Sequence, residues 1–131
     1  MIGLDTNVLI RYITQDDPPQ AHKATQVVEH LLTASSPGFV SSVVMVELVW
    51  VLDRAYGLTA TEIAAVLERL LQIEVFAIEN EQEIFTAMVA LQQGQGSFAD
   101  ALIAALAARA GCNRTLTFDR RAARLPGFEL V

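Results

Sequence analysis

The sequence predicts an α/β fold, namely a three-layer α/β/α sandwich with a central, mostly parallel sheet of four to five strands. Two observations predict it. Short apolar segments alternate along the chain with longer segments that begin with helix-capping residues. The short segments are apolar throughout, as expected for parallel strands that helices cover on both faces. The 131 residues contain no linker, repeat or low-complexity tract, which indicates a single domain over residues 1–131.

Turn and capping residues give the order of these elements. We expect strands at residues 1–4, 39–41, 75–78 and 115–118, with a fifth at 128–131. We expect helices at residues 7–14, 17–32, 43–56 and 59–71, then from 80 to the glycines at 94 and 96, and from 97 to the glycine at 111. Three helices open with a polar residue followed three positions later by an acid, which is the spacing of a capping box: Thr59 with Glu62, Asn80 with Glu83, and Ser97 with Asp100.

Two acidic residues directly follow predicted strands. Asp5 follows the first strand, and Asp119 follows the fourth. Right-handed crossovers place the carboxyl ends of parallel strands at one edge of the sheet, where ligands bind in such folds. Asp100, in the first turn of its helix, and Glu47, inside the apolar segment 43–52, belong to helix starts at the same edge. We therefore expect these four carboxylates to converge.

Each of these acids also has a purely structural interpretation. The three aspartates suit helix starts as caps, and Glu47 with Arg54 fits a solvent-facing stripe on its helix. Taken together, however, four carboxylates at one edge would repel each other, and no lysine or histidine lies beside them in sequence. Divalent cations, one or two per site, would neutralise them. Oxygen ligands favour Mg²⁺ or Mn²⁺ over zinc, which prefers histidine and cysteine.

The segments around these acids resemble a known family. They read Ile-Gly-Leu-Asp5-Thr-Asn7-Val-Leu-Ile, the embedded Glu47, Phe98-Ala-Asp100-Ala-Leu-Ile-Ala, and Thr117-Phe-Asp119. Their order and placement over essentially the whole chain resemble the PIN domain, and more narrowly the VapC toxins of bacterial type II toxin–antitoxin modules. The resemblance implies a Rossmann-like α/β/α fold, Mg²⁺- or Mn²⁺-dependent endoribonuclease activity, and a cognate antitoxin encoded alongside.

The resemblance also implies roles for individual residues. The reaction would be in-line attack of a metal-activated water on an RNA phosphodiester, with Glu47 binding metal or orienting the water. One departure concerns the residues before Glu47: many relatives have a serine or threonine close by, whereas here Ser41 and Ser42 are followed by four apolar residues. An acidic quartet and two supporting polar positions match the family: Asp5, Glu47, Asp100 and Asp119, supported by Asn7 and Thr117.

The charge distribution bears on RNA binding. A net charge of −6 argues against nonspecific binding of nucleic acid over the whole surface. Basic residues nevertheless gather toward the C-terminal end, and Arg120, Arg121 and Arg124 directly follow Asp119. We expect these arginines to contact RNA phosphates. The alternative is that they form an ordinary solvated helix face.

Other classes of function were weighed against the nuclease. A phosphoaspartate protein would also place an aspartate after the first strand, but it usually needs a lysine near the late strands, and a phosphatase needs a second acid where Asn7 stands. A noncatalytic binding module with a PIN-like fold would not need acids at all four positions. Histidine-based RNA cleavage is not expected, because His22 and His30 lie away from the motifs and are predicted at the surface.

The remaining features concern location and partners. No apolar run approaches the ~20 residues of a membrane span, and the N-terminal segment lacks the pattern of a signal peptide. Cys112 is the only cysteine and is expected to be buried. These features predict a cytoplasmic protein without a membrane anchor.

We also expect a homodimer and an antitoxin as protein partners. The two helices around Gly57 carry more apolar residues than a chain of this size readily buries, so part of them is predicted to bind an amphipathic antitoxin helix, with dimerisation elsewhere. The alternative is that all of these residues are core. They are Leu48, Trp50, Val51, Leu52, Ile63, Val66, Leu67 and Leu70.

Overall fold

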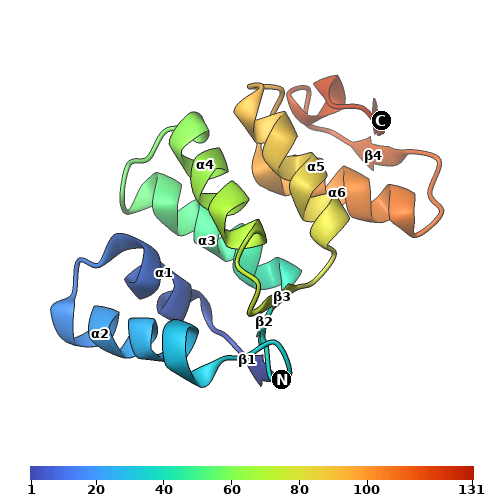
Figure 1. The fold of residues 1–131 in the computed structure, drawn as a ribbon. Helices are drawn as coiled ribbons and strands as arrows, with labels where there is room; N and C mark the ends of the chain where they lie inside the picture. The colour runs from blue at the N-terminus through green and yellow to red at the C-terminus, as the bar shows by residue number, and fades with distance from the viewer.

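Six α-helices and five short strands form the structure, a computed structural model that describes all residues 1–131 (Figure 1). The helices are α1 (Thr6–Thr14), α2 (Pro18–Gln26), α3 (Ser42–Arg54), α4 (Ala60–Leu71), α5 (Glu81–Gln92) and α6 (Phe98–Arg109). The strands are β1 (Ile2–Gly3), β2 (Gly38–Val40), β3 (Phe76–Ile78), β4 (Thr115–Thr117) and β5 (Phe128–Leu130). A π-helical turn (Val27–Leu31) continues α2, and a 3-10 turn (Ala122–Arg124) follows β4. The predicted α/β class is confirmed, and none of the helices has the length and apolar character that a membrane crossing requires.

The first three strands form a parallel sheet in the order β1-β2-β3. Ile2 pairs with Gly38, and Gly38 pairs with Phe76. Gly38 needs its missing side chain, because a Cβ there would stand 2.7 Å from Leu32 Cδ1 and 2.8 Å from Leu4 Cδ1. This close packing fixes the end of β1 and therefore the start of α1 directly after it.

The strands β4 and β5 do not join this sheet. They pair with each other in parallel, Thr115 with Phe128, as a separate two-stranded sheet. The prediction of one central sheet of four to five strands is therefore wrong for this single chain. The physical reason lies in the packing of the segment after β4, where Leu125 is buried against Gly96 and holds the strand pair beside α6. Figure 1 shows β4 and the C-terminus at the opposite end of the molecule from β1 and the N-terminus.

The hydrophobic core lies mainly among α3, α4, α5 and the adjoining turn of α6. Side chains with no exposed surface come from three of these helices: Met45, Leu48, Leu52, Leu67 and Ile84. Phe98 is only 2% exposed. Cys112, expected in the core, is exposed, because it follows Gly111 in the turn that ends α6. His22 and His30 lie at the surface, as predicted.

The starts of two helices test the predicted capping boxes. Thr59 and Glu62 form the complete box at α4, with both reciprocal hydrogen bonds present. The box predicted at Asn80 is absent: this residue is left-handed (φ 54°) and its side chain makes no capping bond. Its amide instead donates to Ser42 Oγ at 2.9 Å and accepts from Arg109 at 3.1 Å. These long-range bonds replace the local ones.

A polar cluster joins the end of α1 to the end of α3. The hydroxyl of Tyr56 donates to Asp16 at 2.7 Å, and Arg11 lies 3.1 Å from the same carboxylate. Hydrogen bonds from the hydroxyl groups of Thr14 and Tyr56 lower the pKa of Asp16 from its ordinary value of 3.8 to about 2. The ionised carboxylate is therefore favoured in the folded chain relative to the unfolded chain.

This lowered pKa predicts a specific pH dependence of stability. The contribution of Asp16 is fully present above the unfolded pKa near 4 and is lost as the pH falls toward about 2. Asp16→Asn should melt modestly below the wild type at pH 6, and the gap should close near pH 2. Thermal melts of both proteins over this range check it. A gap that is the same at both pH values would contradict the assignment.

Candidate active site

Asp5 is placed at the N-terminus of α1 by the end of β1. Its Oδ1 accepts a hydrogen bond from the backbone N–H of Thr6 at 2.8 Å, and its extended backbone makes it the N-cap. The structural interpretation as a cap thus holds, but only one carboxylate oxygen is used. Asn7 is exposed one turn further on. The hydroxyl of Thr6 is buried and has no hydrogen-bond partner.

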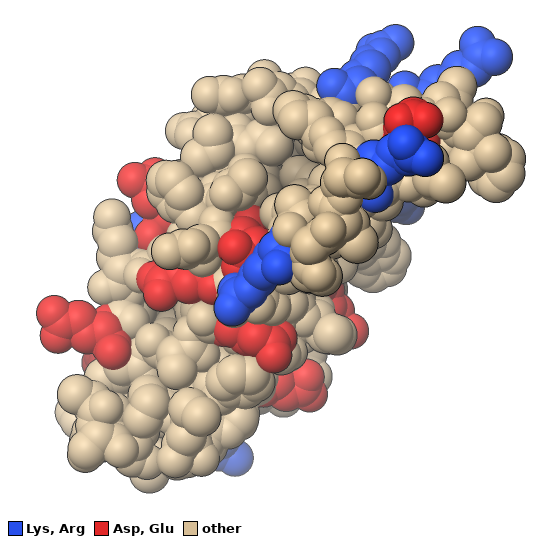
Figure 2. Space-filling view, turned by 90° about the vertical axis from the view of Figure 1, so that its right-hand side faces the viewer, with Lys and Arg blue, Asp and Glu red and all other residues tan.

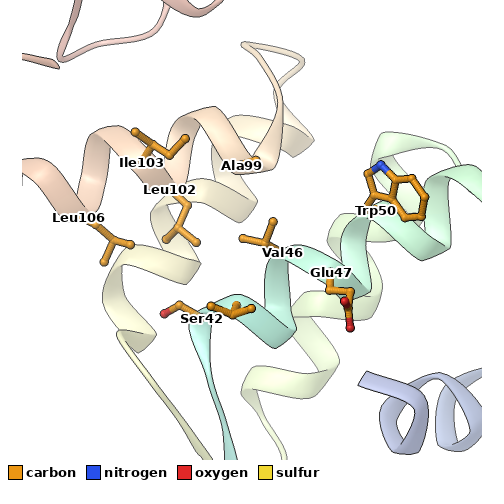
Figure 3. A pocket seen from close by; sticks show the side chains of 9 residues that line it. Ser42, Val46, Glu47, Trp50, Ala99, Leu102, Ile103 and Leu106 are labelled. Atoms are coloured by element: carbon orange, nitrogen blue, oxygen red, sulfur yellow. The ribbon is translucent and has the colours of Figure 1, made fainter. Parts of the chain in front are cut away.

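Glu47 lies on α3, which packs against α1. The helix begins at Ser41, whose hydroxyl accepts from the N–H of Val44 at 3.2 Å. The side chain of Glu47 is exposed at one end of an apolar groove. Figure 3 shows its carboxylate pointing away from Leu102, whereas Val46 points toward that leucine. The two serines before Glu47 are thus used in starting and anchoring the helix.

Asp100 lies in the first turn of α6 and is partly exposed. Its backbone N–H donates to the hydroxyl of Ser97 at 3.1 Å. The reciprocal bond from the carboxylate of Asp100 to Ser97, which a full capping box would have, is not formed. The carboxylate of Asp100 is therefore free of the capping role that sequence spacing allowed.

Thr117 and Asp119 act together in the turn after β4. The hydroxyl of Thr117 accepts from the backbone N–H of Asp119 at 3.0 Å. One carboxylate oxygen of Asp119 accepts from the N–H groups of Arg121 and Ala122, at 2.8 and 3.4 Å. Asp119 is exposed, and its turn is held rigidly by these bonds.

The structure does not bring the four acids together in one chain. No three carboxylate, imidazole or thiol side chains lie close enough to hold one metal ion. The expected convergence of Asp5, Glu47, Asp100 and Asp119 is therefore wrong for the single chain. The reason follows from the divided sheet, since Asp119 follows β4 and does not lie at the edge that carries Asp5. The oxygen donors suit Mg²⁺ or Mn²⁺, but their positions in the isolated chain do not form a site.

Comparison with known proteins decides the family. The sequence pattern of the PIN domain matches residues 2–127, nearly the whole chain. The chain belongs to the PIN domain family. It is also similar to a VapC ribonuclease of Aquifex aeolicus (strain VF5), with 30% identity over 128 residues, which cover 98% of this chain and 93% of that protein.

Charge is unevenly distributed over this PIN domain. Residues 1–100 carry thirteen acidic and four basic side chains, whereas residues 101–131 carry two acidic and five basic ones. Figure 2 shows basic side chains gathered over the end of the molecule that carries the C-terminal strands, and acidic ones over the remainder of that face. Arg120, Arg121 and Arg124 are exposed, and none of them forms a salt bridge. They are therefore available to a polyanion.

An open apolar groove runs between α3 and α6 of the PIN domain. It has a volume of about 520 Å³, and its exposed members include Val43 (76%), Trp50 (58%) and Ile103 (51%). Sequence reasoning missed this groove, because it paired α3 with α4 as the binding surface. Most of the apolar residues named for that surface are core instead: Leu48, Leu52, Ile63, Val66, Leu67 and Leu70 are buried, and Val51 is partly buried.

Sequence reasoning also missed a polar network behind the site. The N–H of Ser42 donates to the carboxylate of Glu79 at 2.9 Å, and Arg109 bridges Asn80 to Glu83, 2.6 Å from the latter. These bonds tie the end of β3 to the start of α3 and the end of α6. They join residues 26 to 37 positions apart, so no local pattern could have indicated them.

Proposed function

We propose that this chain is an endoribonuclease that acts as the toxin of a toxin–antitoxin pair, in the cytoplasm. The observation that carries the proposal is its similarity to a VapC ribonuclease over 98% of its length. The PIN match over residues 2–127 spans all four acidic positions. A noncatalytic module would not need four acids whose side chains are left unpaired.

Mg²⁺ or Mn²⁺, one or two ions per site, is the proposed cofactor, with Asp5, Glu47, Asp100 and Asp119 as its ligands. None of these four carboxylates forms a salt bridge. Asp5 and Asp119 each use one oxygen to cap a backbone segment and keep the other free. Asn7 and Thr117 are the proposed supporting residues, and Thr117 already positions the backbone of Asp119.

The direct test is cleavage of a defined RNA by the purified protein with Mg²⁺, with Mn²⁺ and with EDTA. We expect cleavage with either cation, loss of cleavage in EDTA, and recovery when Mn²⁺ is added in excess. Full cleavage in EDTA would contradict the metal requirement. RNA binding without cleavage under every condition would favour the noncatalytic module.

The arginines after Asp119 are the proposed RNA contacts. Arg120→Gln combined with Arg121→Gln should weaken RNA binding to a similar extent for all sequences. The dependence of log affinity on log salt should fall by about 0.7 for each lost phosphate contact to a single strand. Binding measured at several salt concentrations checks this. Arg69→Gln, an exposed arginine on α4, is the control and should leave the slope unchanged. An unchanged slope in the double variant would assign the arginines to a merely solvated surface.

The antitoxin is the proposed protein partner, and the groove between α3 and α6 is its proposed docking site. A peptide lying there would cover Trp50 and Ile103 and end beside Glu47, so binding would also block the proposed site. Buried aromatic residues are frequent hot spots, where truncation costs 2 kcal/mol or more, about thirtyfold in affinity.

Trp50→Ala should therefore weaken binding of the antitoxin, encoded by the neighbouring gene, by about thirtyfold. Cleavage of RNA by the free variant should be unchanged. Calorimetric titration with that antitoxin checks the prediction, and Phe85→Ala, an exposed phenylalanine outside this groove, is the matched control. Equal affinities for both variants would remove the antitoxin from this groove.

A further inference from the structure

The strand β1 leaves one edge unpaired. The N–H groups of Ile2 and Leu4 donate to the carbonyl groups of Pro37 and Phe39 in and beside β2, each at 2.9 Å. Because backbone groups alternate along a strand, the N–H and C=O of Gly3 point to the other edge, where no strand lies. The space around Gly3 is open, with no atom within 4 Å of the place where a Cβ would stand.

The strand β4 also leaves one edge unpaired. The N–H of Thr115 donates to Gly127 at 2.7 Å, and the C=O of Thr117 accepts from Val131 at 2.9 Å. The backbone groups of Leu116 therefore point to the free edge. Leu116 is 57% exposed and Phe118 is 85% exposed. An exposed apolar edge strand is a template for pairing with another chain.

The two free edges are complementary in charge and in register. β1 belongs to the acidic part of the chain, and β4 belongs to the basic C-terminal part (Figure 2). Asp5 stands two residues after the end of β1, and Asp119 stands two residues after the end of β4. If the two strands lay side by side in parallel with their ends level, these carboxylates would be neighbours.

A chain with this fold cannot make that pairing with itself. Leu125 packs so closely on Gly96 that a Cβ there would stand 2.8 Å from Leu125 Cδ1. Ala122 is buried in the turn between the two strands, and a Cβ at Gly127 would stand 3.6 Å from Ala104 Cβ on α6. These contacts hold β4 and β5 on α6, at the far end of the molecule from β1 (Figure 1).

We propose that two copies of this chain exchange their C-terminal strands, so that β4 of each copy pairs in parallel with β1 of the other. Each half of the dimer then has one sheet in the order β3-β2-β1-β4-β5, and Asp119 of one copy lies beside Asp5 of the other. The exchange is reciprocal, as a two-fold symmetric dimer requires. It covers Leu116 and Phe118 and satisfies both free edges. That the shared acids form a nuclease site rests on the proposed function, whereas the strand exchange itself does not.

The first test separates this interface from every other. Leu116→Pro removes one N–H from the free edge of β4 but keeps the bonds of Thr115 and Thr117 to β5. Leu130→Pro is the matched control, because Leu130 is an exposed leucine whose N–H points to the outer edge of β5. Size-exclusion chromatography with light scattering should give a mass twice 14.3 kDa for the wild type and Leu130→Pro, and 14.3 kDa for Leu116→Pro. A monomeric wild type, or a dimeric Leu116→Pro, would overturn the exchange.

The second test asks whether the copies share a site. Asp5→Asn and Asp119→Asn chains are co-expressed with different tags, and the mixed dimer is purified through both. Strand exchange leaves one of the two composite sites with both aspartates, so the mixed dimer should have about half of wild-type cleavage. Each homodimeric variant should have little. A mixed dimer as inactive as its parents would show that each copy completes its own site. If the wild type itself cleaves nothing, the proposed function fails, and the chromatography still decides the exchange.

Discussion

Asp5→Asn and Asp100→Asn are each expected to reduce RNA cleavage at least a hundredfold while the protein remains folded. Each change removes one negative charge from a proposed cation ligand and nearly preserves its shape. Replacing residues that merely orient metal ligands already costs about 10- to 100-fold in affinity or activity, so losing a ligand should cost more. Initial rates of cleavage in Mn²⁺, compared with the wild type at equal concentration, measure the effect.

The structure allows this loss to be separated from a loss of stability. Asp5 Oδ1 caps α1 by accepting from Thr6, and an asparagine oxygen caps nearly as well. Asp17 provides a matched control, because it caps α2 in the same way by accepting from Gln20 at 3.2 Å and belongs to no proposed site. Asp17→Asn should cleave RNA at the wild-type rate, and all variants should melt close to the wild type. Equal cleavage by Asp5→Asn and Asp17→Asn would leave Asp5 with a capping role alone.

The local features of the fold could be predicted because they depend on residues close in sequence. The capping box of Thr59 and Glu62 was predicted and is confirmed, as is the end of α3 near Gly57, which has a φ of 64°. The order of helices and strands follows from such signals. Asn80 shows the limit of this reasoning. Its side chain had the right spacing for a cap, but bonds to Ser42 and Arg109, far away in sequence, took precedence.

Burial along α3 could not be predicted for a related reason. The helix is apolar on nearly every side, so periodicity does not separate the core face, with Leu48 and Leu52, from the exposed face, with Val43 and Trp50. Only the position of α6 decides which face is covered. The same holds for the sheet, because the alternation of strands and helices does not reveal that Leu125 holds β4 on α6.

The candidate site was therefore predictable in its residues and not in its assembly. Asp5 and Asp119 do follow strands, as the sequence indicated, and Asp100 does lie in the first turn of its helix. Their meeting depended on a single sheet, which the isolated chain does not form. Strand exchange would restore the predicted sheet order within a pair of chains, which reconciles the sequence pattern with the open edges of the structure.

Phe98→Ala is expected to be the most destabilising of the substitutions considered, lowering the free energy of unfolding by about 3–5 kcal/mol. Phe98 opens α6, is only 2% exposed and belongs to the main hydrophobic core. Removing its ring deletes apolar contacts and leaves a cavity that the surrounding helices fill only in part. At roughly 3–5 °C per kcal/mol for a domain of this size, the melting temperature should fall by more than about 10 °C. Thermal melts and urea titrations measure it.

Phe85 on α5 is the matched control for this prediction, because it is the same residue type on the neighbouring helix but is 52% exposed. Phe85→Ala should cost about 1 kcal/mol or less, since partly exposed side chains lose little burial. Phe98→Leu should recover a large part of the lost stability by refilling the cavity. Because Phe98 fixes the start of α6 two residues before Asp100, the alanine variant should also lose RNA cleavage at temperatures where it is still folded. Equal destabilisation by Phe98→Ala and Phe85→Ala would mean that α6 does not pack on the core through Phe98, and the placement of Asp100 would then have to be revised.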